Sequence, residues 1–271
     1  MEEIRPVPYT PLTNEELNEL RYAKDLLENP GFTARMANVL GSPIERGIQM
    51  LPQDWSEGLN KAVRSALFKA LEVAVVSLGE KAPRKSSEFM HKLMVGASGT
   101  IGGAFGLASV AFELPISTTI MLRSIADIAR SEGFDIKAVE TQLNCLEVFA
   151  IGGRTEVDDA AESSYWAARA ALGEIMSEAA RHISRRGVVE RTAPAIVRFI
   201  SAIASRFGVV VSEQAAAKAV PVIGAASGAV INVLFIDHFQ DMARGHFIVK
   251  RLEAKYSIET VESAYTQIRS Q

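Results

Sequence analysis

The stretch that decides the fold is LMVGASGTIGGAFGLASVAF, residues 93–112, where 20 consecutive positions carry no charged side chain. A second stretch, AVPVIGAASGAVINVLFI, covers residues 219–236 and continues for 18 positions without a charge. The alternation of apolar and polar residues that marks a half-buried strand is rare in both stretches and in the rest of the chain. We therefore predict two apolar helical segments at the centre of the protein.

Glycines recur four positions apart in both segments. They are Gly99, Gly102, Gly103 and Gly106 in the first segment, and Gly224 and Gly228 in the second. Glycines at this spacing share one helix face, and the missing side chains let a second backbone approach closely. Each glycine inside a helix costs about 1 kcal/mol relative to alanine. The pattern therefore predicts either tight packing along this face or a tunnel that accepts an acyl chain.

The sequence around these segments also has the pattern of helices. Thr13 and Glu16 have the spacing of a helix-capping box, and the apolar residues after position 54 recur with a period near 3.6. Pro115 is expected to break or kink the chain and to start a new helix over about 116–132. The predicted fold class is all-α, a multi-helix bundle around two glycine-rich apolar helical segments.

Composition restricts the compartment and the class of partner. The sequence contains no clear linker, so we predict one domain over residues 1–271, with a core of about 60–255 and N-terminal helices within 13–51 as an appended part. The single cysteine excludes a disulfide within the chain, and no basic segment precedes an apolar run at the N-terminus. We expect a cytoplasmic protein, with the option of peripheral attachment to the inner face of the membrane. A formal charge of −3 gives no case for nucleic acid.

Glu113 and the helix after it form the first candidate site. Glu113 has apolar neighbours, and a carboxylate in such a place must be solvated, paired or neutral. Arg123, Asp127 and Arg130 follow at i, i+4 and i+7 on one helix face. This cluster could bind an anionic headgroup or a phosphate, because arginine forks match such oxygens. The alternative is a structural network of salt bridges that holds the corner at Pro115.

A basic region is the second candidate. Its residues are Arg181, Arg185, Arg186, Arg191 and Arg198. They could contact anionic lipid, with each residue contributing about 1 kcal/mol near a charged surface. The alternative is a solvated face whose arginines pair with the acidic region over residues 156–178.

Other residue types give weaker indications. His238 and Asp241 are three positions apart on one predicted helix, but a metal site would need a third ligand, and we predict no metal. Cys145 lies among apolar residues and is interpreted as a small core residue. The glycine-rich run lacks the spacing of a nucleotide-phosphate loop, so no cofactor is predicted. Nothing in the sequence specifies an oligomeric state.

Residues 113–133, ELPISTTIMLRSIADIARSEG, resemble the signature of the EcsC family of bacterial proteins. The preceding glycine-rich run, residues 149–153 and residues 219–246 are similar to the same family, and the resemblance covers about 60–255. The family takes its name from a gene beside an ABC transporter, and it offers no catalytic residues to carry over. The resemblance implies a role at the cytoplasmic side of a membrane.

Three functional hypotheses follow. The leading one is a non-enzymatic helical protein that binds lipid or another apolar ligand, or that associates reversibly with the cytoplasmic face of a membrane. The second is a hydrolase, peptidase-like or lipase-like, with an unrecognised site. The third is a soluble interaction scaffold that regulates a membrane transporter, which implies a membrane-protein partner.

Overall fold

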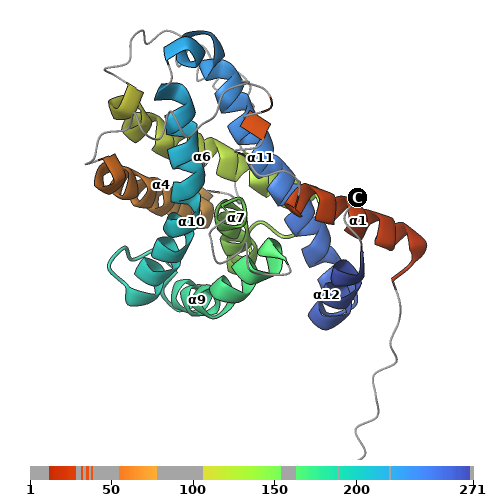
Figure 1. Ribbon diagram of the computed structural model, residues 1–271. Coiled ribbons are helices and arrows are strands. Elements are labelled where there is room, and N and C mark those ends of the chain that lie inside the picture. Colours follow the sequence, from red (N-terminus) through yellow and green to blue (C-terminus); the bar gives the residue numbers. More distant parts are fainter. Residues whose placement is uncertain are drawn as a thin grey trace, which may run out of the picture.

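The computed structural model describes residues 12–28, 32, 35, 36, 38, 55–77, 106–153, 163–187, 189–219 and 221–268, and gives only the helical backbone for 106–113, 219 and 221–229. Every regular element within these ranges is an α-helix (Figure 1). The helices are α1 (Asn14–Glu28), α4 (Trp55–Ser77), α6 (Gly106–Ser131), α7 (Val139–Ile151), α9 (Ser164–Arg186), α10 (Pro194–Ala219), α11 (Pro221–Lys255) and α12 (Ile258–Gln267). The prediction of an all-α fold is confirmed.

The helix signals near the N-terminus act as the sequence predicts. The Glu16 carboxylate accepts from the Thr13 backbone N–H at 2.9 Å, and the Thr13 hydroxyl accepts from the Glu16 N–H at 3.3 Å. These reciprocal bonds satisfy backbone donors that the first turn of α1 leaves without a partner. The predicted apolar face of α4 is buried, and it consists of Leu59, Val63, Ala66, Leu67, Ala70 and Leu71.

Helix α7 lies at the centre of the described part of the chain (Figure 1). It packs against α4, α6, α9, α10 and α11. All residues from Thr141 to Ile151 are buried, the polar Gln142, Asn144 and Glu147 among them, so this part of α7 faces other parts of the protein on every side. The sequence analysis placed the glycine-rich segments at the centre instead. Gly99, Gly102 and Gly103 lie outside the described residues, and Gly106, Gly224 and Gly228 belong to ranges where only the backbone is described.

Pro115 does not separate two helices, so that prediction is wrong. Helix α6 continues through it from Gly106 to Ser131. Proline removes one backbone donor, but two nearby hydroxyls add hydrogen bonds on the same stretch. Thr119 donates to the Pro115 carbonyl oxygen at 2.8 Å and Ser117 donates to that of Leu114 at 3.1 Å. Packing of α6 against α4 and α11 adds tertiary stabilisation to the helix that carries the proline.

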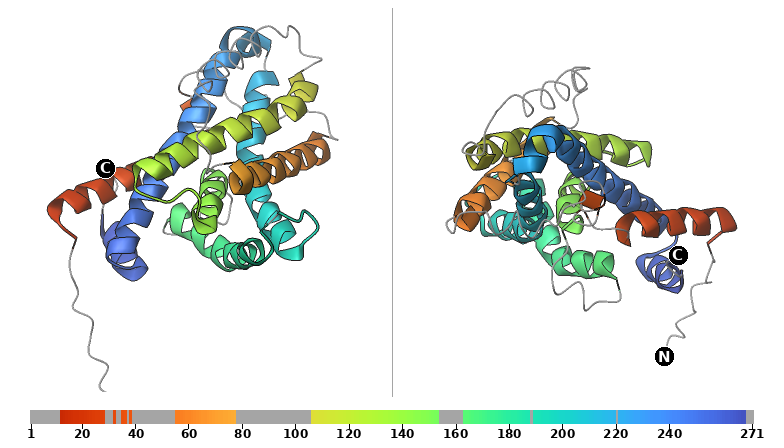
Figure 2. Two further views of the ribbon diagram at one scale, coloured as in Figure 1. Left: turned by 180° about the vertical axis from the view of Figure 1, so that it is seen from behind. Right: turned by 45° about the horizontal axis from the view of Figure 1, so that its top comes forward.

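Helix α11 is the longest element, with 35 residues, and it crosses the molecule diagonally in Figure 1. Helix α1 packs along it, as both views of Figure 2 show. The contact requires Gly245, because a Cβ atom there would lie 2.9 Å from the Ala23 carbonyl oxygen and 2.6 Å from Leu27 Cγ. A glycine inside a helix therefore does permit close backbone approach here, at a position that the predicted glycine pattern does not include.

One described helix is long and apolar enough to cross a membrane. It covers Pro194–Lys218, has a mean hydropathy of 1.6 in its most apolar window, and 56% of that window is buried in the molecule. A core helix of a soluble bundle meets the same test. The central residues 208–211 of this helix, which look strand-like in the sequence, are helical.

Candidate functional site

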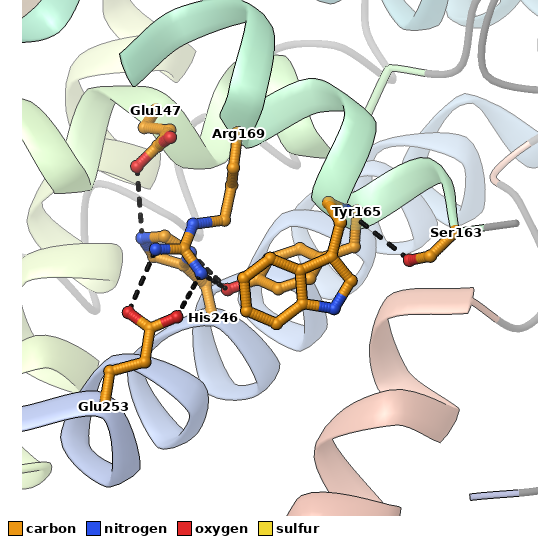
Figure 3. Close-up of polar contacts among 7 residues, drawn as sticks. Glu147, Ser163, Tyr165, Arg169, His246 and Glu253 are labelled. Atoms are coloured by element: carbon orange, nitrogen blue, oxygen red, sulfur yellow. Dashed lines mark hydrogen bonds and ion pairs between the residues drawn. The ribbon is translucent and has the colours of Figure 1, made fainter. Parts of the chain in front are cut away.

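A chain of buried polar side chains connects α7, α9 and α11 (Figure 3). Glu147 comes from α7 and is 2% exposed. Tyr165 and Arg169 lie one turn apart on α9, and His246 and Glu253 lie two turns apart on α11, so each pair shares one helix face. The sequence therefore brings five polar groups to a place surrounded by three packed helices.

His246 is the central member of this chain and is fully buried. Its Nε2 atom lies 3.5 Å from Glu147 Oε2, and its Nδ1 atom lies 3.2 Å from the Tyr165 hydroxyl oxygen. Arg169 donates from Nη1 to the same hydroxyl at 3.3 Å. Its two terminal nitrogens also bind the two carboxylate oxygens of Glu253, at 2.5 and 2.9 Å.

These contacts fix the direction of the hydrogen bonds. Because Arg169 can only donate, the Tyr165 oxygen accepts from it and the Tyr165 proton points to His246 Nδ1. Nδ1 is then the acceptor nitrogen of a neutral imidazole, and Nε2 carries the hydrogen that faces Glu147. The hydrogen-bonded chain runs from Arg169 through Tyr165 to His246 Nδ1, whereas His246 Nε2 and Glu147 Oε2 lie 3.5 Å apart without forming a hydrogen bond.

Burial favours the uncharged forms of both Glu147 and His246. Desolvation raises the pKa of Glu147 above its ordinary value, although the charges of Arg169 and Lys250 act in the opposite direction. Desolvation also lowers the pKa of His246 well below its ordinary value, and the same two cations lower it further. Both shifts favour the uncharged forms of the two groups that meet at this 3.5 Å contact.

The N-terminal end of α9 lies beside the same chain of polar side chains. Ser163 caps α9, and its hydroxyl accepts from the Trp166 N–H at 3.4 Å. The same hydroxyl donates to Glu28 of α1 at 2.5 Å, and Tyr265 of α12 donates to that carboxylate at 3.0 Å. The guanidinium of Arg169 lies over the Trp166 ring, 4.8 Å from its centroid. Polar bonds and ring contacts thus tie α1, α9 and α12 together.

A second feature is a basic corner, defined by Arg181, Arg185, Arg186 and Arg198, where the end of α9 meets the start of α10. These arginines line a pocket of about 460 Å³ together with Glu178, His182, Pro194 and Ala195. All four arginines are exposed. Arg198 forms an ion pair with Glu178, as the alternative interpretation of the basic region expects. Arg191 lies outside the corner and pairs with Glu72 of α4 at 2.7 Å.

The predicted cluster on α6 is brought together only in part. Asp127 and Arg130 form an exposed ion pair at 2.6 Å. Arg123 is half-buried one turn earlier on α6. The side chain of Glu113 lies outside the described residues. The observed pair fits the structural alternative, a salt bridge on the surface of α6, and the headgroup site stays a prediction.

His238 and Asp241 do not converge on a common point. His238 Nε2 lies 2.8 Å from the Gly152 carbonyl oxygen, whereas Asp241 binds Arg35 at 2.6 Å and Arg244 at 2.9 Å. Within the ranges that the structure describes, no group of three or more His, Cys, Asp and Glu residues is placed to hold a metal ion. Cys145 is buried, and burial raises the pKa of its thiol to about 12, which suits a core residue.

Sequence reasoning missed most of the buried polar chain. Glu147 carried the detectable signal, because it is a lone carboxylate among Leu146, Val148 and Phe149. The same logic was applied to Glu113 and would have selected Glu147 as well. Arg169 and Glu253 gave no such signal, because both lie in stretches with many charged residues.

The profile of the EcsC protein family matches residues 14–252. The chain belongs to the EcsC family. No curated protein and no solved structure matches it. The family match in this EcsC chain begins with α1 and includes the basic corner, so it also takes in residues that the sequence analysis treated as an appended part.

Proposed function

We propose that this EcsC protein is a peripheral membrane protein that binds an anionic lipid surface through its basic corner. The observation that carries the proposal is the gathering of four exposed arginines at one junction of two helices. Glu178 is the one carboxylate that lines their pocket. The corner therefore has a strong local positive charge on a chain whose formal charge is −3.

Three of the four arginines are available to a ligand. Arg181, Arg185 and Arg186 make no ion pair with any residue that the structure describes. Arg185 and Arg186 lie in the last turn of α9, where a positive charge also stabilises the helix dipole. That role does not explain Arg181, which lies one turn earlier, or Arg198, which comes from another helix.

The size of the electrostatic attraction supports reversible attachment to the membrane. A basic residue near an anionic bilayer contributes about 1 kcal/mol, and the attraction decays within a Debye length. Three unpaired arginines therefore provide about 3 kcal/mol, which is enough for salt-sensitive binding and far less than insertion of a helix. Glu147 is buried beneath three helices, so the buried polar chain gives the hydrolase hypothesis no carboxylate that a substrate could reach.

The test is co-sedimentation with vesicles that contain phosphatidylglycerol in phosphatidylcholine. The triple variant R181Q/R185Q/R186Q should bind on the order of a hundredfold more weakly than the unmodified chain, since it loses about 3 kcal/mol. Binding of the unmodified chain should also fall as salt is raised from 50 to about 300 mM.

The matched control is R21Q/K61Q/R64Q, which removes the same charge from exposed positions on α1 and α4. It should reduce vesicle binding far less than the first triple variant, because these positions lie outside the basic corner. Equal losses for the two triple variants, or no sedimentation of the unmodified chain, would contradict the proposal.

A further inference from the structure

We infer that the pocket of the basic corner is a specific site for a phosphomonoester dianion. This inference rests on the proposed function and deepens it, because it assigns a headgroup chemistry to the charged surface. Arg181 and Arg185 lie four positions apart on one face of α9, and Arg198 faces them from α10. The pocket of about 460 Å³ between them is within the usual size range of small-molecule sites.

The donors around this pocket suit a phosphate group with several free oxygens. Each guanidinium offers five N–H groups in a planar fork that matches phosphate oxygens in pairs. Pro194 and Ala195, the first residues of α10, also line the pocket, and of the two only Ala195 has a backbone N–H to offer. The first turn of a helix leaves backbone N–H groups without a partner in the helix and carries partial positive charge. The two sources of donors belong to different elements, and both border one cavity.

The number of arginine donors around the pocket favours a terminal phosphate. A phosphodiester headgroup has ester bonds on two sides and one negative charge, so only two of its oxygens are free. A phosphomonoester ends in three free oxygens and carries about −1.5 to −2 charges at pH 7. It can enter a concave site end-on and bind several arginines at once. The site therefore favours a monoester over a diester at equal surface charge density.

Beside this pocket lies a second one of about 370 Å³, between α9 and the start of α7. It shares Arg181 and Arg185 with the first pocket, and Met176 and Ala180 contribute apolar surface to it. A molecule whose phosphate binds the shared arginines can place a less polar part against these residues. The two pockets together fit a phosphate attached to a glycerol unit, either free or in a lipid.

Two probes separate the sources of that chemistry. The first is vesicles with phosphatidic acid or phosphatidylglycerol, adjusted to equal surface potential. The second is glycerol 3-phosphate, followed by calorimetry with the full chain in solution. We expect at least fivefold tighter binding to phosphatidic acid vesicles and competition by glycerol 3-phosphate.

The decisive variant is E178Q, which removes the carboxylate that pairs with Arg198. It should raise the affinity for glycerol 3-phosphate about fivefold, because the Arg198 guanidinium becomes free to bind phosphate. A gain of binding cannot result from misfolding. The second variant, R181K/R185K, keeps the charge but loses the forks. It should retain binding to phosphatidylglycerol and lose the preference for phosphatidic acid.

The outcomes distinguish this inference from the proposed function. Equal binding to both kinds of vesicle, with no binding of glycerol 3-phosphate, would overturn the specific site and leave electrostatic membrane binding intact. Binding of glycerol 3-phosphate without binding to any vesicle would support the site, and would overturn the membrane proposal. An unchanged affinity in E178Q would count against the assignment of this pocket.

Discussion

Replacing Gly153 with alanine should destabilise the fold by about 3 kcal/mol, the upper end of the usual range for overpacking. Gly153 follows α7 and lies directly against the backbone of α10. A Cβ atom there would lie 2.1 Å from the Arg206 carbonyl oxygen and 2.5 Å from its carbonyl carbon. The Arg206 side chain also donates to the Gly153 carbonyl oxygen at 3.1 Å. Because the obstacle is backbone rather than a flexible side chain, the two helices must separate.

Thermal unfolding followed by circular dichroism measures the effect. For a chain of this size, 1 kcal/mol corresponds to about 2–4 °C in Tm, so G153A should melt about 6–12 °C below the unmodified protein. The matched control is G173A in α9, where nothing lies within 4 Å of an added Cβ atom. Alanine should stabilise that helix by about 1 kcal/mol. A Tm of G153A within 1 °C of the unmodified protein would show that α7 and α10 are not in this contact.

Stability should be greatest between about pH 4.5 and 6.5, the ordinary pKa values of Glu147 and His246. The folded pair holds one proton across a wide range, because the pKa of Glu147 is raised and that of His246 is lowered. The unfolded chain holds one proton on the two groups only between those values. Above pH 6.5 it holds none, so folding takes up a proton and the free energy of unfolding falls by about 1.4 kcal/mol per pH unit.

Below pH 4.5 the unfolded chain holds two protons on these groups, and stability falls again as the pH decreases. Glu16 adds to this loss, because hydrogen bonds from Lys255, Tyr256 and Thr13 lower its pKa to about 2. Differences between variants therefore isolate the buried pair better than the absolute curve does. The charged groups that face the pair are Arg169, Lys250 and Glu253.

Two variants separate the contributions of Glu147 and His246 to the pH dependence of the free energy of unfolding. Urea unfolding at each pH would measure this dependence. E147Q removes the proton uptake on the carboxyl, so its stability should be flat above pH 6.5 where that of the unmodified protein declines. H246Q leaves the buried carboxyl alone, so its decline should begin near pH 4.5 instead of 6.5. Parallel profiles for E147Q and the unmodified protein would mean that Glu147 ionises normally in the folded state.

Local patterns predicted local structure well in this chain. The capping box at Thr13, the apolar face of α4 and the end of α6 two residues before Gly133 follow from rules that act over a few residues. Pro115 shows where such rules fail, since the local preference to end a helix is weaker than the packing of α6 against two other helices. The preference of Pro115 to end a helix acts within one turn, whereas the continuity of α6 depends on contacts with segments that are distant in the sequence.

The candidate site was predicted only where its residues are neighbours in the sequence. The sequence indicated a basic region of five arginines from Arg181 to Arg198, and the structure places four of them around one pocket, whereas Arg191 pairs with Glu72. The buried chain joins Glu147, Arg169 and Glu253 across more than 100 residues. Its members come from three helices whose mutual arrangement no single-segment pattern encodes, and only the apolar surroundings of Glu147 could have signalled it.

The burial of α7 from Thr141 to Ile151 limits how this protein can move. Its backbone amides can exchange with solvent only when the surrounding helices come apart, so local fluctuation cannot expose them. We therefore expect α7 to keep its position in any rearrangement that accompanies ligand binding at the surface. Helix α9 carries both the buried Arg169 and three arginines of the basic corner. A displacement of α9 on ligand binding would therefore move the buried polar contacts as well.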